Sequence, residues 1–275
     1  MRLKVALIGC GAIGTVLAQA IDKGRAGKAE LSWLYDVNSE KSEILAKKLR
    51  FKPRIASSVV EIYSDKTVSL VIEASSQLAV KQYSLDAINS GKDLMVMSVG
   101  AFADEKLLKK VRSAAEQSGR RVYIPSGAVL GIDGIKAAEL GEIKEATLTT
   151  SKPPAALVYS SYLKERGIDL MRLKKPRVVF EGSAREAVKA FPSSVNVAAT
   201  LSLAGIGLDK TKVRIVADPK LRLNVHEIRV RGKAGELVTE ARNVSFPDAP
   251  KTSYLAALSA IQTLRNLSES IRVGT

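Results

Sequence analysis

The sequence predicts an α/β protein in which a doubly wound parallel sheet is followed by a second, α+β domain with an open sheet. Over residues 1–125, short apolar runs alternate with amphipathic segments of helical period, a pattern typical of a parallel sheet with helices on both faces. After Pro125, strand-like runs follow one another with fewer helices between them, which favours an α+β domain. We therefore expect two domains, 1–125 and 126–250.

The first domain is expected to alternate strands and helices along the chain. The strand-like runs are apolar enough to be buried, and they cover residues 2–9, 29–36, 68–74, 93–99 and 120–126. The helical segments between them cover residues 12–24, 39–50, 77–90 and 104–118. We expect Gly24 to act as the C-cap of the first helix and Ser39 as the N-cap of the second.

The second domain is expected to group its strands. Helical segments cover residues 131–141, 183–191, 195–205 and 252–267. Strand-like runs cover residues 143–154, 176–182, 212–218, 222–230 and 235–244. We expect the last three strands to be consecutive and antiparallel, joined by turns at Pro219 and at glycines. One face of this open sheet would need a cover, which a second subunit would provide.

Composition excludes several classes of protein. The 43 Lys and Arg against 28 Asp and Glu give a formal charge of +15, but they are spread along the chain and aromatic residues make up only 5%; this favours a basic surface that attracts small anions over a nucleic-acid site. One cysteine and one histidine exclude an intramolecular disulfide and a Cys/His metal cluster.

The apolar stretches are too short for a membrane. The longest, residues 94–103, is about half the length that a membrane span needs. The apolar run at the N-terminus breaks on three glycines without a small-residue cleavage site after it, which is not the pattern of a signal peptide. We therefore expect a cytoplasmic protein with no membrane partner.

A glycine pattern follows the first expected strand. Residues 9–14 read Gly-Cys-Gly-Ala-Ile-Gly, so Gly9, Gly11 and Gly14 form the G-x-G-x-x-G motif of a Rossmann domain. The first glycine permits a tight turn, the second lets the main chain approach a pyrophosphate, and the third lets helix and strand pack closely. The sequence thus predicts an NAD or NADP site at Gly9, Gly11, Ala12, Ile13 and Gly14. Cys10 needs only to be small, and we assign it no catalytic role.

An acidic residue stands at the end of the second expected strand. Asp36 lies about twenty residues past Gly14, where a carboxylate accepts hydrogen bonds from the adenosine ribose and repels a 2′-phosphate. Asp36 therefore favours NAD over NADP. A flavin would fit the glycines equally, but no second flavin signature is present. Small residues at 73–76 and 98–102 are suited to close approach of a nicotinamide ring, although ordinary turns would explain them too.

Longer strings in the second half resemble a known family. They occur in the order IPSGAVLGIDGIKAA, TTSKPPAAL, FEGSAREAVKAFPSSVNVAATLSLAG, VRIVADP, NVHEIRVRG and PKTSYLAALSAI. With the glycine loop, they closely resemble the L-aspartate dehydrogenases, an NAD(P)-dependent family, over nearly the whole chain. The resemblance is weaker in SGAVLGIDG, where the family more often has a paired glycine, and residues 158–176 have no clear counterpart.

The resemblance implies a reaction, an assembly and a set of site residues. It implies oxidative deamination of L-aspartate to iminoaspartate, then to oxaloacetate and ammonia, which can feed NAD synthesis. It implies a homodimer, a mixed sheet in the second domain, and a last helix (252–267) that packs on the first domain. By position, His226 matches the catalytic histidine, and Ala128 and Asn196 match residues that contact the cofactor near the nicotinamide.

The residue types suit this chemistry independently. Water attack on an imine needs proton transfer, and histidine is the side chain with an unperturbed pKa near neutrality. Asn196 offers both a donor and an acceptor to a carboxamide. The two carboxylates of aspartate need cationic or hydroxyl partners, and we expect them among Lys152, Lys251, Thr252 and Ser253. No metal is expected.

Two other functions share parts of this pattern. A reductase of the dihydrodipicolinate type has the same architecture, but that family uses a histidine-rich motif, and a single histidine counts against it. A redox sensor that holds NAD without turnover would have no need of polar site residues in its second domain. Formation of NADH with L-aspartate distinguishes the three. His226 itself also has a simpler explanation, as a half-exposed residue of an ordinary strand.

Overall fold

The chain divides into two compact units. The computed structural model describes residues 2–158, 160–192, 195–246 and 249–274, apart from the side chains of Pro250 and Lys251. One unit comprises Met1–Pro125 and Ala257–Thr275, and the other comprises Ser126–Ala256. In the described ranges, no helix is both long and apolar enough to cross a bilayer.

The first unit is built on a six-stranded sheet of order β3-β2-β1-β4-β5-β6. Every neighbouring pair of strands is parallel. The strands are β1 (Leu3–Ile8), β2 (Ala29–Tyr35), β3 (Arg54–Ile55), β4 (Leu70–Glu73), β5 (Asp93–Val96) and β6 (Val122–Tyr123). The predicted doubly wound parallel sheet is confirmed, although the sequence pattern missed the short edge strand β3.

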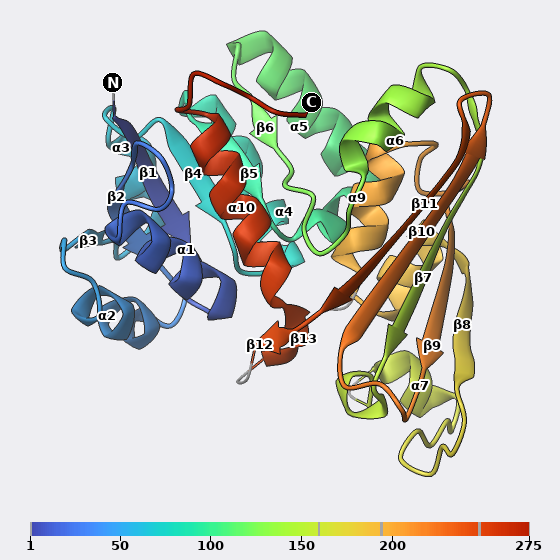
Figure 1. The fold of residues 1–275 in the computed structure, drawn as a ribbon. Helices are drawn as coiled ribbons and strands as arrows, with labels where there is room; N and C mark the ends of the chain where they lie inside the picture. The colour runs from blue at the N-terminus through green and yellow to red at the C-terminus, as the bar shows by residue number, and fades with distance from the viewer. Residues whose placement is uncertain (1, 159, 193–194, 247–248, 275) are drawn as a thin grey trace. The chain divides into compact units, whose positions relative to one another are not determined.

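Helices cover both faces of this sheet (Figure 1). They are α1 (Ala12–Asp22), α2 (Ser39–Lys47), α3 (Val59–Ser64), α4 (Gln77–Asn89), α5 (Glu105–Ser118) and α10 (Tyr254–Asn266), with the 3₁₀ helix η1 (Val99–Ala103). Side chains of α1, α2 and α10 share one apolar core with β1, β2, β4 and β5. Ala260 and Leu264 of α10 are fully buried in that core. The helix therefore completes the first unit from the far end of the chain.

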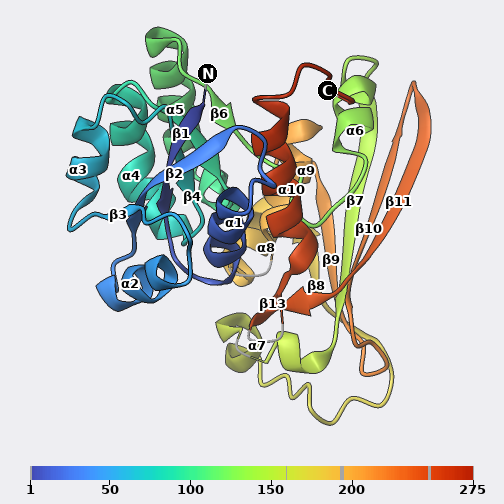
Figure 2. The same ribbon diagram turned by 60° about the vertical axis from the view of Figure 1, so that its left-hand side comes forward.

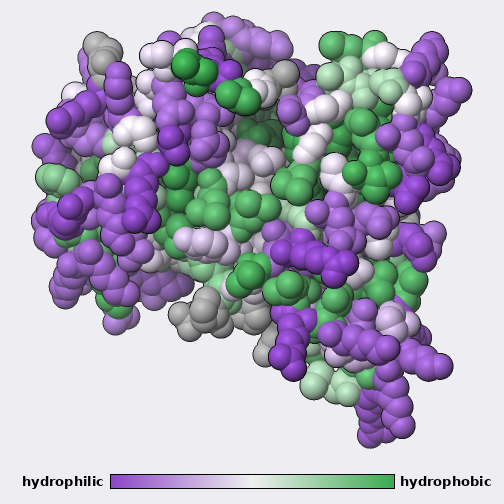
Figure 3. Space-filling view, viewed as in Figure 1, coloured by the Kyte–Doolittle hydropathy of each residue, from purple (hydrophilic) through white to green (hydrophobic). Residues whose placement is uncertain are grey.

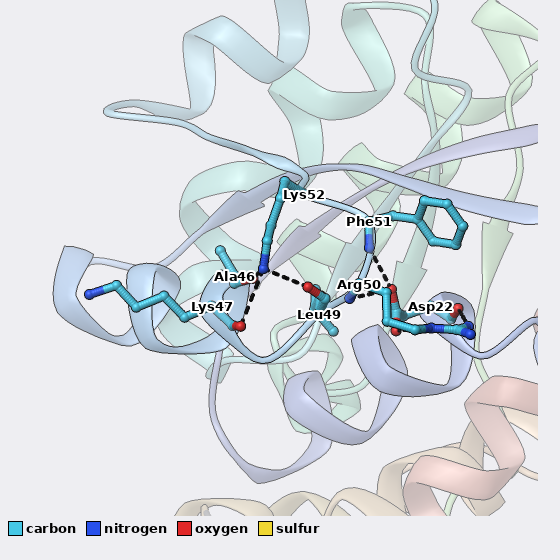
Figure 4. Close-up of polar contacts among 7 residues, drawn as sticks. All are labelled: Asp22, Ala46, Lys47, Leu49, Arg50, Phe51 and Lys52. Carbon is cyan, nitrogen blue, oxygen red and sulfur yellow. Dashed lines mark hydrogen bonds and ion pairs between the residues drawn. The ribbon is translucent and has the colours of Figure 1, made fainter.

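Helix α2 differs from its predicted limits at both ends. Its N-cap is Asn38, whose side chain accepts the Glu40 N–H at 3.1 Å, so the prediction of Ser39 was wrong. The helix ends at Lys47 and not near Arg50, because the Arg50 and Phe51 N–H groups donate to the Asp22 carboxylate, each at 2.9 Å (Figure 4). The Lys52 ammonium caps the C-terminus of the helix, because it donates hydrogen bonds to the carbonyls of Ala46, Lys47 and Leu49.

The second unit is built on a five-stranded mixed sheet of order β11-β10-β7-β9-β8. The strands are β7 (Ile143–Lys152), β8 (Arg177–Ser183), β9 (Lys212–Ala217), β10 (Asn224–Gly232) and β11 (Gly235–Asn243). Strands β7 and β9 are parallel and the other pairs are antiparallel. The predicted second α+β domain with a mixed sheet is therefore confirmed.

Strands β9 and β10 are not neighbours, so that part of the prediction was wrong. Strand β7 lies between them. The segment after β9 forms no hairpin, because the Asp218 N–H donates to the Lys152 carbonyl of β7 at 2.9 Å and the Asp218 side chain accepts the Lys220 N–H at 2.9 Å. A local turn at Pro219 thus carries the chain across β7.

Helices lie on one face of this sheet (Figure 2). The helices of the unit are α6 (Ile132–Glu139), α7 (Ser161–Glu165), α8 (Ala184–Ala190) and α9 (Asn196–Ala204), with the 3₁₀ helix η2 (Pro154–Ala156). Helices α6, α8 and α9 pack together and α8 packs on β8 and β9. Within the described ranges, no helix covers the opposite face of β7 and β10.

The last predicted helix starts later than expected. Thr252 and Ser253 belong to strand β13 (Ala249–Ser253), which pairs with β12 (Ser245–Phe246). Ser253 is opposite Ser245 in this ladder, so its main chain serves a strand. The helix α10 begins at Tyr254, whose N–H donates to the Val244 carbonyl at 2.9 Å.

Candidate functional site

The glycine loop lies at the reversal of strand order in the first unit. Strand β1 is followed by α1 and has β2 on one side and β4 on the other. Open α/β sheets bind dinucleotides at such a reversal of strand order. Gly9 has φ +102°, and a Cβ there would lie 2.6 Å from the Ala74 carbonyl oxygen. A Cβ on Gly14 would overlap the Gly9 carbonyl oxygen. Both positions therefore admit only glycine.

Gly11 is free of this packing constraint. A Cβ on it would meet no atom within 4 Å. Gly11 is the N-cap of α1, and among the described residues it has no side-chain hydrogen bond that caps the helix. The first N–H groups of α1 are thus left for a ligand. Ala12 and Ile13 form the first turn of that helix. The loop fits a pyrophosphate, because the space beside Gly11 is open and the first main-chain N–H groups of α1 lie next to it.

Asp36 stands directly beside the glycine loop. Its carboxylate accepts the Cys10 N–H at 2.8 Å and the Asn38 N–H at 3.0 Å. These bonds brace the loop against the end of β2 and still leave acceptor capacity, since a carboxylate has about four lone-pair sites. The structure thus brings Asp36 and the three glycines together, as a ribose and pyrophosphate site requires.

Glu73 is a buried acid near the glycine loop that the sequence analysis did not single out. It is the last residue of β4 and only 2% exposed. Its carboxylate accepts four hydrogen bonds, from the N–H groups of Ser75, Ser76 and Ser98 and from the Ser98 hydroxyl, at 2.8–3.0 Å. Burial raises the pKa of this carboxyl although the hydrogen bonds oppose the change. An acid at the end of an otherwise apolar strand was the signal available.

Glu73 joins the segments after β4 and β5. Ser98 precedes the 3₁₀ helix η1, and the Ala74 N–H donates to the Ile8 carbonyl at 2.8 Å. The carboxylate of Glu73 therefore joins the ends of β4 and β5, while a main-chain hydrogen bond links the residue after it to β1. The small residues that the sequence offered for close approach to a nicotinamide lie on the two segments that Glu73 holds.

Cys10 is a buried thiol within the loop. Its Sγ lies 3.5 Å from the Ser42 Oγ, and burial raises its pKa to about 11. A thiol with so high a pKa is a poor nucleophile at neutral pH, which supports our assigning it no catalytic role.

In the second unit, Ala128 and Asn196 lie on adjoining segments. Ala128 is buried, and the buried Asn243 side chain of β11 donates to its carbonyl at 2.9 Å. Asn196 is the first residue of α9. A Cβ on Gly127 would be 4.0 Å from a methyl group of Val197, so the residues next to Ala128 and Asn196 lie close to each other. Asn243 was not predicted, and it holds the main chain at Ala128.

His226 lies on the buried face of β10. It is 3% exposed, so it is not the half-exposed strand residue of the simpler explanation. Its register partners are Thr150 on β7 and Ala241 on β11. The imidazole Nδ1 lies 3.0 Å from the Thr150 hydroxyl. Among the described residues, Thr150 is the hydrogen-bond partner of this ring.

Lys152 lies on the same buried face as Thr150. The two residues are separated by one position on β7, and alternate residues of a strand point to the same side. Lys152 is 2% exposed. Burial and the positive charge of Lys152 lower the pKa of His226 to about 3. The expected near-neutral pKa was therefore wrong, because the sequence does not show that this histidine is buried beside a cation.

The other three predicted substrate residues are on strand β13. Thr252 is half-buried and Ser253 is buried. The Lys251 side chain lies outside the described residues. Across the described ranges, no group of three His, Cys, Asp or Glu side chains is placed to hold a metal ion.

The surface mixes residue types. Figure 3 shows hydrophilic side chains over the face that it displays, with hydrophobic ones between them. Several basic side chains are paired, as in Arg185–Asp209 and Arg229–Glu236, both at 2.6 Å. The expectation that the chain binds no nucleic acid stays a prediction.

Family models match both units. Residues 133–267 match the model of "Aspartate dehydrogenase, C-terminal". Residues 9–125 match the model of "Homoserine dehydrogenase, NAD binding domain". The first unit is thus an NAD(P)-binding domain. The glycine loop and Asp36 lie within that match.

Relatives match the chain from end to end. The L-aspartate dehydrogenase of Methanosarcina barkeri is 49% identical over 273 residues, which cover 99% of this chain and 100% of the relative. That of Methanococcus maripaludis strain C7 is 45% identical over the same coverage. This similarity favours neither the dihydrodipicolinate-type reductase nor the redox sensor.

Solved structures agree. The crystal structure of aspartate dehydrogenase from Thermotoga maritima is 33% identical, has a TM-score of 0.78 and is covered in full, as is this chain. A homoserine dehydrogenase from Thiobacillus denitrificans, 14% identical with a TM-score of 0.63 over 98% of this chain and 73% of that one, shares only the fold. Since close identity extends over almost the whole length of both chains, this protein belongs to the L-aspartate dehydrogenase family of oxidoreductases.

Proposed function

We propose that the chain catalyses the NAD(P)-dependent oxidative deamination of L-aspartate to iminoaspartate, which water converts to oxaloacetate and ammonia. The observation that carries the proposal is the pair of buried side chains on one face of the second sheet, His226 and Lys152. An imidazole with one nitrogen open to accept a proton, and a cation on the same buried face, suit a dicarboxylate that loses a hydride and a proton.

We assign the expected cofactor contacts to two groups of residues. Gly9, Gly11, Ala12, Ile13 and Gly14 would hold the pyrophosphate, and Asp36 the adenosine ribose, which supports NAD over NADP. Ala128 and Asn196 would contact the nicotinamide end, as the family resemblance implies. When bound, the oxidised nicotinamide supplies a two-electron acceptor.

The reaction divides into hydride loss and hydrolysis. The Cα–H bond of L-aspartate breaks with its electron pair leaving as hydride, a proton leaves the amino group, and the C=N bond of the imine forms. Water then adds to that carbon, and the C–N bond breaks to release ammonia and oxaloacetate. We assign proton transfer in the hydrolysis to His226, whose Nε2 lies away from the Thr150 contact.

Lys152 would bind one carboxylate of the substrate. A buried ammonium attracts a carboxylate more strongly than a surface one, because water does not screen the pair. Either Thr252 or Ser253, which are consecutive residues of β13 and therefore point to opposite sides of it, would offer a hydroxyl donor to the second carboxylate, and we keep Lys251 as a further candidate. Aspartate would fit better than a monocarboxylate amino acid, since both carboxylates would have partners.

We also propose a cellular setting for the reaction. The imine or its product would feed NAD biosynthesis, and the enzyme would act as a cytoplasmic homodimer. The uncovered face of the mixed sheet in the second unit supports the homodimer, because an open sheet face is a common site of association. A sedimentation measurement of the mass in solution tests the assembly.

The experiment that tests the activity is formation of the reduced cofactor by the purified protein with L-aspartate. NAD and NADP are supplied separately, and ammonia and oxaloacetate are assayed as products. We expect turnover with L-aspartate, and at least tenfold lower kcat/KM with L-alanine or D-aspartate. Equal rates with L-alanine would contradict the carboxylate role of Lys152, and no turnover with L-aspartate would contradict the proposed function.

A further inference from the structure

The imidazole of His226 has one fixed nitrogen and one open nitrogen. Nδ1 lies 3.0 Å from the Thr150 hydroxyl, and both residues are buried to at least 97%. Among the described residues no partner is recorded for Nε2. Whatever proton His226 gives or takes must therefore pass through Nε2, and which form Nε2 has depends on the Nδ1 contact.

Thr150 is well placed to set this form. It is directly opposite His226 in the antiparallel pair of β7 and β10, where Cβ atoms are about 4.5–5.5 Å apart. Threonine is β-branched, so its χ1 is restricted and its hydroxyl is held in place. The contact is thus part of the sheet itself, since both ends are anchored on paired strands.

A charged imidazole is disfavoured at this position. Burial, together with the positive charge of Lys152, lowers the pKa of His226 to about 3 and so keeps the imidazole neutral at pH 7. Two neutral tautomers then remain. If the Thr150 hydroxyl donates to Nδ1, Nε2 carries the proton and cannot act as a base. If Nδ1–H donates to the Thr150 oxygen, Nε2 presents a lone pair to the reacting atoms.

We propose that Thr150 is a positioning residue that accepts a hydrogen bond from Nδ1–H of His226 and so holds Nε2 in the unprotonated form that activates water. The inference rests on the proposed function, because only hydrolysis of the imine requires a base at this step. It assigns Thr150 no contact with substrate or cofactor. Its effect passes through the imidazole alone.

The single histidine makes the tautomer directly measurable. With one histidine in 275 residues, a protein labelled with ¹⁵N-histidine gives one set of ring signals in a long-range ¹H–¹⁵N correlation spectrum. We expect the full-length wild-type protein to show a protonated Nδ1 and a bare Nε2. A spectrum with the proton on Nε2 would overturn the proposal.

Three variants connect the tautomer to the chemistry. Thr150→Val removes the hydroxyl, and we expect it to mix the tautomers and to lower kcat roughly 10- to 100-fold, the range seen when a metal-ligating histidine loses the group that orients its ring. Thr150→Ser keeps the hydroxyl and should stay within about threefold of wild type with the wild-type spectrum. The matched control is Thr149→Val, on the opposite face of β7, which should change neither readout.

The outcomes separate this inference from the proposed function. A wild-type protein that is inactive with L-aspartate would refute the proposed function, whereas the NMR spectrum would still report the Thr150 contact. Wild-type kcat in Thr150→Val would refute the positioning role alone. If that variant does not fold, the wild-type spectrum and Thr150→Ser decide, because the inference requires the Nδ1–H form in both.

Discussion

The two units treat their buried titratable groups in opposite ways. Glu73 in the first unit is 2% exposed and accepts four hydrogen bonds, three of them from main-chain N–H groups. His226 in the second unit is 3% exposed and, within the described part of the chain, has one hydrogen bond, beside a buried cation. A saturated acceptor stabilises the segments that donate to it, whereas a ring with an open nitrogen remains able to react. The first unit thus satisfies its buried carboxyl group fully, whereas the second leaves one imidazole nitrogen without a partner among the described residues.

The largest expected effect is loss of turnover when the imidazole is removed. General acid–base catalysis typically contributes about 10²–10⁴-fold, and we expect His226→Ala to lower kcat within that range. His226→Asn keeps polarity without titration and should be nearly as slow. Steady-state kinetics with L-aspartate measure the loss, and titration of NAD(P) binding should show wild-type affinity. If either variant keeps more than about half of wild-type kcat, His226 is only a buried strand residue.

Glu73→Gln sharpens the comparison from the structural side. The amide turns at least one N–H toward a buried donor, and an unsatisfied buried group costs about 1–3 kcal/mol. We expect the free energy of unfolding to fall by that amount, measured by urea denaturation, and NAD(P) binding to weaken because the segments after β4 and β5 loosen. Ser98→Ala removes one of the four bonds and should cost about 1 kcal/mol.

A Glu73→Gln variant with unchanged stability would contradict the structural role of this carboxylate. A fall in kcat without any change in unfolding or cofactor affinity would instead make Glu73 resemble His226. Either result would remove the contrast between the two units.

The sequence pointed to the glycine loop and Asp36 but not to Glu73, and the difference has a physical reason. The glycine loop was readable because close main-chain packing requires glycine at fixed spacing, and Asp36 was singled out because a carboxylate that binds a ribose is expected at a fixed distance from that loop. Glu73 was not, because its partners are N–H groups of two segments that become neighbours only when β4 and β5 pair. Hydrogen bonds to the main chain leave no mark on residue type at the donor.

The second unit shows the same limit in its sheet and its site. The alternation of residue types located β7, β9 and β10. It did not predict that β7 lies between the other two, because the turn at Asp218 after β9 resembles the turn of a hairpin in the sequence. His226 was located by resemblance, whereas its burial and lowered pKa follow from Thr150 and Lys152, more than seventy residues earlier in the chain. Asn243, which holds Ala128, was missed for the same reason.

The pH dependence of stability tests the lowered pKa of His226. In the folded state its pKa is about 3, against the usual 6.5, so only the unfolded chain binds this proton between those values. Stability is therefore fully present above pH 6.5 and is lost as the pH falls toward 3. Between pH 7 and pH 5 we expect this group to lower the unfolding free energy of the wild type by ~2 kcal/mol.

His226→Asn is the reference for that measurement. This variant lacks the titrating group and keeps all others. In urea denaturation at pH 7, 6 and 5, its free energy of unfolding should therefore fall less with decreasing pH than that of the wild type, by the amount expected for His226. Parallel curves for the two proteins would mean that the imidazole titrates normally and is not held neutral beside Lys152.

A further expected effect concerns which cofactor the first unit prefers. Asp36 accepts two main-chain N–H groups, so it is structural like Glu73, but it also stands where a ribose would lie. Asp36→Asn keeps the size and one acceptor oxygen and removes the charge that would repel a 2′-phosphate. We expect the ratio of NAD to NADP affinity to fall roughly tenfold, the factor that corresponds to about 1.4 kcal/mol.

The matched control is Glu40→Gln, which removes one charge from the exposed first turn of α2 and should leave the ratio unchanged. Equal weakening of both cofactors by Asp36→Asn would limit Asp36 to bracing the loop, whereas a changed ratio with intact unfolding would show that one carboxylate serves both structure and recognition.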